Sequence, residues 1–176
     1  MGYVRLILAL IMLIYSHSAV SQAMGPEIPA QEKTRIASLA QLALRDKDIT
    51  EAQYQSTMVF LNSRPCVGVD RTLSVAMKAK FAFAIAKTEA VKKLEVLAAF
   101  RFKAWRILYV SHAQSENNFL FYAGDPLTSP RQGSWSGGAS IFETADIQKW
   151  LKKNIAGIPP QLASCFAWHV TLNRRD

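Results

Sequence analysis

The sequence predicts an α+β fold in which N-terminal helices pack on a small antiparallel sheet. Apolar residues recur at helical spacing, with helix-capping signals, through about residues 31–93. Segments of alternating or continuous apolar residues follow over about residues 100–173, separated by prolines and glycines. For this C-terminal half we predict the order strand, strand, helix, strand.

Residues 1–23 have the pattern of a cleaved signal peptide. A basic start precedes the short apolar run Leu6–Tyr15, and small residues, Ser21 and Ala23, stand before the expected cleavage point. A membrane anchor is the alternative, but a spanning helix needs about 20 apolar residues and this run is shorter. We therefore expect residues 24–176 to form a single exported domain, periplasmic or secreted, without a transmembrane segment.

The chain has two cysteines, Cys66 and Cys165. In an exported protein an even pair indicates one disulfide bond. Closing a loop of about 100 residues stabilises a fold by up to about 4.7 kcal/mol in the chain-entropy model. We expect this bridge to connect the helical half to the last predicted strand.

The positive charge is concentrated in one segment. The formal net charge is +8, and residues 64–106 carry ten Lys and Arg against three Asp and Glu. A basic region of this kind attracts anions, which for an exported chain are envelope lipids, acidic polymers or an acidic protein, with nucleic acid a poor candidate. A solvated helix face that maintains solubility explains the same charge.

Three helices are predicted in the first half. The first covers Gln31–Arg45. The second begins at Thr50, because Thr50 and Gln53 match a capping box, and ends before Pro65. Asp70 is the predicted N-cap of the third helix.

Three strands are predicted in the second half. The alternating and then continuously apolar stretch Phe100–Val110 is the first, and Phe119–Tyr122 is the second. The polar break Ala113–Asn118 predicts a hairpin between them. Ser164–Leu172 alternates again and is the third predicted strand, while Ala90–Ala99 suits either a helix or a strand.

A long loop is predicted between the hairpin and the last strand. Residues 123–138 contain two prolines and four glycines, and loops of this length often carry function. A helix over Ile141–Asn154 follows, with a capping box formed by Ser140 and Glu143. Pro159 and Pro160 are predicted to stop it.

We hypothesise a small exported binding or inhibitory protein that contacts its partner, another protein or an anionic envelope component, through this loop with help from the basic segment. An alternative function is an envelope-surface module that binds an anionic polymer or lipid through the basic residues of 64–106. The candidate contact residues are Tyr122, Asp125, Arg131 and Trp135. Trp135 either contacts the partner or folds inward to anchor the loop. The sequence matches no nucleotide-binding or serine-hydrolase motif, and we expect no cofactor.

Two chemical alternatives use the cysteines and histidines. Cys66 could act as the nucleophile of a Cys–His hydrolase, with His112 or His169 as the base. A disulfide would remove that nucleophile. A metal site built from the two histidines with Asp125 or Glu143 has no ligand motif behind it, and we expect no metal.

Overall fold

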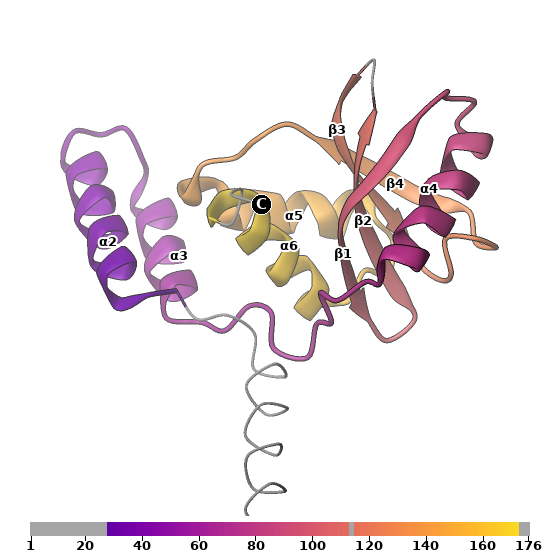
Figure 1. The fold of residues 1–176 in the computed structure, drawn as a ribbon. Helices are drawn as coiled ribbons and strands as arrows, with labels where there is room; N and C mark the ends of the chain where they lie inside the picture. The colour runs from indigo at the N-terminus through magenta and orange to yellow at the C-terminus, as the bar shows by residue number, and fades with distance from the viewer. Residues whose placement is uncertain (1–27, 113–114, 173–176) are drawn as a thin grey trace, which may run out of the picture.

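The computed structural model describes residues 28–112 and 115–172 (Figure 1). The predicted signal peptide, the turn of the predicted hairpin at 113–114 and the C-terminal tail at 173–176 lie outside the described residues. The described elements are, in chain order, α2 (Ala30–Arg45), α3 (Glu51–Leu61), α4 (Val75–Thr88), β1 (Leu94–Phe102), β2 (Trp105–His112), β3 (Ser115–Tyr122), β4 (Arg131–Ser136), the 3₁₀ turn η1 (Ile141–Glu143), α5 (Thr144–Asn154) and α6 (Pro160–Leu172).

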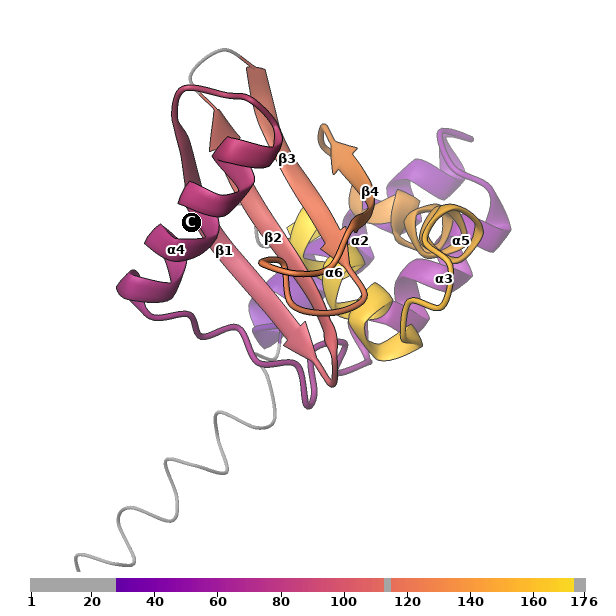
Figure 2. The same ribbon diagram turned by 90° about the vertical axis from the view of Figure 1, so that its right-hand side faces the viewer.

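The strands form one antiparallel sheet in the order β1-β2-β3-β4, so the predicted α+β class is confirmed. Helix α4 covers one face of the sheet, and α5 and α6 lie against the other (Figures 1 and 2). Helices α2 and α3 pack side by side, and α3 contacts α5 and η1 on the side away from the sheet. The antiparallel pairing of β2 with β3 confirms the predicted hairpin.

Each face of the sheet has its own apolar core. The smaller core lies under α4 and is made of residues from that helix and all strands but β4. The larger core fills the space between the sheet, α5, α6 and α3. Fully buried large side chains in the two cores include Phe81, Leu108 and Leu120 on the α4 side, and Phe100, Phe121, Leu151, Leu162 and Phe166 on the other.

Both predicted capping boxes are present. Thr50 and Gln53 cap α3, and Ser140 and Glu143 form the same reciprocal pair, although the second pair starts the 3₁₀ turn that runs into α5. The third helix begins later than predicted, with Ser74 rather than Asp70 as its N-cap. Asp70 has other partners, described below, which hold it at the edge of the sheet.

Residues 164–172 were predicted to form a strand but belong to helix α6, so this prediction is wrong. The apparent alternation does not separate polar from apolar positions, because Cys165 and Ala167 are apolar as well. All residues of Cys165–Val170 are buried, as in a helix enclosed on every side. Helix α5 ends at Asn154, before the two prolines as predicted, but Pro160 then occupies the first position of α6, where its fixed φ suits a helix start.

The stretch 100–110 is not one strand. The chain turns back at Lys103 and Ala104, and Phe102 pairs with Trp105. Lys103 adopts φ 54°, a conformation that glycine or asparagine usually supplies in such turns. The sequence therefore carries no hairpin signal at this point, and β1 extends back to Leu94 instead.

The predicted loop 123–138 contains strand β4, which pairs with β3 at the sheet edge. Serines and a glycine give β4 a weak intrinsic preference for strand. Its pairing with β3 and the packing of Trp135 on α5 hold it in place. The loop itself is reduced to residues 123–130 before β4 and 137–138 after it.

The close approach of β4 to the end of α5 predicts a non-additive pair of substitutions. A Cβ at Gly133 would overlap Cδ1 of Ile155, which is almost fully buried. We expect Gly133→Ala to lower the free energy of unfolding by about 1–3 kcal/mol. Ile155→Val removes that methyl group and alone costs about 0.5–1.5 kcal/mol.

In the double variant the new methyl group occupies the space that the Ile155 methyl group left. The double variant should therefore lose clearly less free energy of unfolding than the sum of the losses in the two single variants. Denaturant unfolding of the four proteins measures this coupling. Ser134→Ala, on the exposed face of the same strand, is the control and should change stability by less than about 0.5 kcal/mol. Additive losses would show that β4 does not pack on α5 in this way.

Candidate functional site

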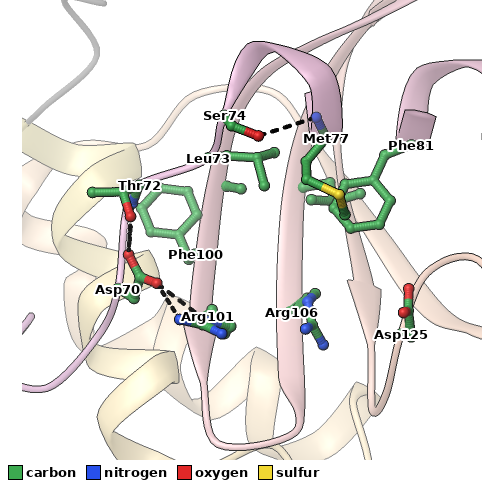
Figure 3. A pocket seen from close by; sticks show the side chains of 12 residues that line it. Asp70, Thr72, Leu73, Ser74, Met77, Phe81, Phe100, Arg101, Arg106 and Asp125 are labelled. Atoms are coloured by element: carbon green, nitrogen blue, oxygen red, sulfur yellow. Dashed lines mark hydrogen bonds and ion pairs between the residues drawn. The ribbon is translucent and has the colours of Figure 1, made fainter. Parts of the chain in front are cut away.

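A trough of about 260 Å³ opens on the α4 side of the sheet (Figure 3). Its walls are the start of α4, the segment 70–74 that precedes it, and the turn at Asp125. Side chains of β1 and β2 form its base. The trough brings together one candidate from the predicted loop, Asp125, and two arginines of the basic segment, Arg101 and Arg106.

The two arginines lie directly opposite each other on neighbouring strands. Arg101 of β1 pairs with Arg106 of β2, one step from the Lys103–Ala104 turn. Like charges at such cross-strand positions destabilise a sheet. This arrangement therefore requires compensation from nearby carboxylates, from solvent or from a bound anion.

Asp70 compensates one of the two arginines. Its Oδ2 accepts hydrogen bonds from Nη2 and Nε of Arg101 at 2.6 and 3.1 Å, and the two residues also exchange backbone hydrogen bonds. Oδ1 accepts from the Thr72 hydroxyl at 2.6 Å and from the Thr72 N–H at 2.8 Å. The Thr72 hydroxyl is the main cause, with Arg101 adding to it, of the lowered pKa of Asp70.

Arg106 has no such partner among the described residues. Its Nη1 makes long contacts with two carbonyl oxygens, 3.4 Å to Ala104 and 3.5 Å to Gly124. No carboxylate of the described residues forms an ion pair with it, although Asp125 lies across the trough. The Arg106 guanidinium therefore keeps unused donors at the trough.

The base of the trough is apolar. Leu73 and Met77 are half-buried at its upper wall, and Phe81, Ala99 and Leu108 are buried beneath. A charged donor above an apolar base is a typical combination in ligand sites, where a few polar groups orient a largely apolar contact. The sequence placed Arg101 and Arg106 only within the broad basic segment, because the unrecognised turn hid their cross-strand register.

The other residues predicted to contact a partner do not line the trough. Tyr122 is buried in the core under α4, and burial raises its pKa. Arg131 pairs with Tyr122 across the strands and forms a 2.7 Å ion pair with Glu89 at the end of α4. Tyr122 is also the cross-strand partner of Arg106, so Tyr122 and Arg131 continue the row of the arginine pair across β3 and β4.

Trp135 faces the opposite side of the sheet. Its ring packs edge-on against Trp150 of α5 with centroids 4.8 Å apart, and Phe166 lies 6.1 Å away. Of the two orientations that the sequence left open, this is the inward one. Of the four candidate residues, the structure thus places Asp125 in the lining of the trough, Tyr122 and Arg131 on the strands next to Arg106, and Trp135 on the opposite face of the sheet.

Cys66 and Cys165 form the predicted disulfide, with their Cα atoms 4.5 Å apart. The bridge joins the segment after α3 to a helix rather than to a strand. His169 lies one turn after Cys165 in α6 and packs its buried ring against Phe100 and Phe119. The sulfur that a Cys–His hydrolase would use is bonded to another sulfur here.

His112 is the last residue of β2. Within residues 28–112 and 115–172, no group of three or more His, Cys, Asp or Glu side chains is placed to hold a metal ion. Over the same residues, no helix is long and apolar enough to cross a membrane.

Comparisons with known protein families, with curated proteins and with solved structures find no significant match. Function must therefore be inferred from the chemistry of the site itself.

The Asp70 contacts predict a pH-dependent loss of stability in Asp70→Asn. At neutral pH the variant should lose about 1 kcal/mol, because charge-assisted bonds to Arg101 disappear and two guanidinium groups face each other uncompensated. The pKa of folded Asp70 is lowered, so its contribution is complete above the ordinary value of about 3.9 and is lost as the pH falls through the lower folded value.

Denaturant unfolding of wild type and variant across this range measures the effect, and the two curves should converge in acid. Asp125→Asn is the matched control, because an asparagine keeps the hydrogen bond accepted from the Leu127 N–H. A stability difference for Asp70→Asn that is the same at all pH values would contradict the assigned role of the Asp70 carboxylate.

The disulfide predicts that the denatured, unreduced protein contains no free thiol. Reduction should lower the free energy of unfolding by about 2–5 kcal/mol, because the bridge spans a sequence separation of 99 residues. A thiol titration with and without reductant checks the first point, and unfolding in both states checks the second. Two free thiols in the native protein would restore the Cys–His hydrolase hypothesis.

Proposed function

We propose that the protein is a small binding protein of an oxidising compartment outside the cytosol. It captures a protein partner by accepting, in the trough, a short segment with one carboxylate beside apolar side chains. The observation that carries this proposal is the Arg106 guanidinium, which has no carboxylate partner among the described residues and stands above an apolar base.

A carboxylate is the group that best satisfies Arg106. Planar guanidinium groups bind carboxylates through two parallel hydrogen bonds, and such charge-assisted bonds are stronger than neutral ones. A carboxylate bound there would also offset the repulsion between Arg106 and Arg101. Apolar neighbours of the carboxylate would then cover Leu73 and Met77, which are half-exposed in the free protein.

The two aspartates of the trough favour a single carboxylate over a polyanion. Asp70 and Asp125 stand on opposite walls, so a ligand with several negative groups would place one of them against a carboxylate. Repulsion of this kind gives specificity against the wrong ligand. The trough therefore suits a segment of a protein better than an acidic polymer.

The compartment is supported by the disulfide and by the predicted signal peptide. Structural disulfides are stable in oxidising compartments and rare in the cytosol. The bridge also anchors the chain that leads into the wall of the trough, since Cys66 lies four residues before Asp70. An inhibitory role is one form that such capture could take.

A pair of short capped peptides tests the proposal. The probe has one glutamate between two leucines, and its match has glutamine in place of the glutamate. We expect the glutamate peptide to bind the wild type more tightly, and Arg106→Gln to weaken it about tenfold or more, because a hydrogen bond to a charged group is lost. Calorimetry or chemical-shift titration gives both affinities.

Lys103→Gln is the control, because it removes a positive charge from the neighbouring turn without changing the lining of the trough. It should leave the affinity nearly unchanged. Equal weakening by the two variants would indicate general attraction by positive charge, and equal binding of the two peptides would exclude carboxylate recognition at Arg106.

A further inference from the structure

The outward side of α4 exposes large apolar side chains. Phe83 is 77 % exposed and Val75 is 84 % exposed, whereas Phe81 and Ile85 of the same helix are buried against the sheet. Figures 1 and 2 show α4 on the outside of the sheet, and none of the other labelled elements lies over its outward side. These side chains do not contribute to either core.

The exposed apolar surface continues into a groove between α4 and β1. The groove has a volume of about 570 Å³, and its apolar lining consists mainly of Val75, Ala79, Ala82, Leu94 and Leu97. Val75, Ala79 and Phe83 follow at intervals of four residues, so they lie along one side of the helix. An apolar strip therefore runs from the groove to Phe83.

Lysines border this strip on both sides. Lys80 and Lys87 are exposed and stand three residues before and four residues after Phe83, next to it on the helix surface. Lys93 lines the groove on the other side, where Glu95 is the only carboxylate of the described lining. Helix α4 itself contains no acidic residue.

We infer that this side of α4 docks on the surface of an anionic phospholipid bilayer. An apolar strip flanked by lysines is the surface that lies in the headgroup region of a membrane. Phe83 enters the boundary with the acyl chains, the groove beside α4 receives apolar lipid atoms, and the ammonium groups of Lys80, Lys87 and Lys93 contact lipid phosphates.

Charge complementarity favours this occupant over a second copy of the chain. Two copies joined through α4 would bring lysines of both helices together, whereas anionic headgroups neutralise them. The inference is independent of the trough, which lies on the other flank of α4 and is lined there by Leu73 and Met77. Each surface can therefore be disabled without changing the other.

Sedimentation with lipid vesicles tests the inference. The chain is used from Met24, because the apolar run before it would bind lipid by itself and every described element lies after it. We expect binding to phosphatidylcholine vesicles that contain phosphatidylglycerol, little binding to phosphatidylcholine alone, and release by added salt. Phe83→Ser should weaken binding about tenfold, because burial of the phenyl ring is lost.

The double variant Lys80→Glu, Lys87→Glu should weaken binding by about tenfold or more, since each lysine contributes near an anionic surface. The matched controls are Val59→Ser, which changes an exposed apolar residue of α3, and Lys152→Glu with Lys153→Glu, which makes the same charge change on α5. Both controls should stay close to the wild type, and circular dichroism checks that all variants fold.

Three outcomes would overturn the inference. These are no binding of the wild type to anionic vesicles, equal binding to neutral and anionic vesicles, and losses in the controls as large as those in the α4 variants. Charge-dependent binding that is unaffected by Phe83→Ser would also overturn it, because lysines alone would then account for the attraction.

Discussion

Burial of both faces of the sheet is the constraint on which the rest of the structure depends. Ile107, Leu108 and Val110 of β2 are fully buried although neighbouring residues of a strand point to opposite faces, and Phe119–Tyr122 of β3 is buried in the same way. A sheet with this composition must be covered twice. Helix α4 covers one face and α6 the other, and α5 with α3 then encloses α6 from behind. The disulfide at Cys165 fixes this inner helix to the segment after α3.

The same constraint explains which parts of the fold the sequence could predict. Helices at the surface have one solvent-exposed side, so α2 shows helical periodicity in its sequence. The start of α3 was predictable from its capping box, which the structure confirms. Helix α6 is enclosed, and an enclosed helix has no polar stripe from which its period can be read. Strand β4 was missed for a different reason: its residues carry too weak a signal. Gly133, Ser134 and Ser136 have little preference for strand, so the strand depends on pairing with β3. The disulfide was predictable because composition and compartment decide it without geometry.

The trough was predictable only in part, and the reason lies in one turn. The charge count located a basic segment, and the proline- and glycine-rich stretch gave Asp125 as a candidate. Neither shows that Arg101 and Arg106 face each other, because that depends on the reversal at Lys103. A lysine in a left-handed conformation is uncommon, and a pattern of side chains does not reveal it. The cross-strand pair follows from the register of the hairpin, which local sequence did not specify.

The wall of the trough is an irregular segment, and its position is set by contacts at successive residues. Cys66 is tied to α6, Val69 is buried, and Asp70 forms a two-way backbone bridge with Arg101. The guanidinium of Arg71 lies 5.4 Å from the ring centres of Phe100 and Trp168, on the far side of β1. Asp70 thus holds this segment through Arg101 on one face of the sheet, and Arg71 holds it through Phe100 and Trp168 on the other. Preorganisation of this kind lowers the cost of ordering a site when a ligand binds. The fold also determines which charge in the trough is available. The backbone bridge between Asp70 and Arg101 holds the Asp70 carboxylate against Arg101, and Arg106 is left as the available donor.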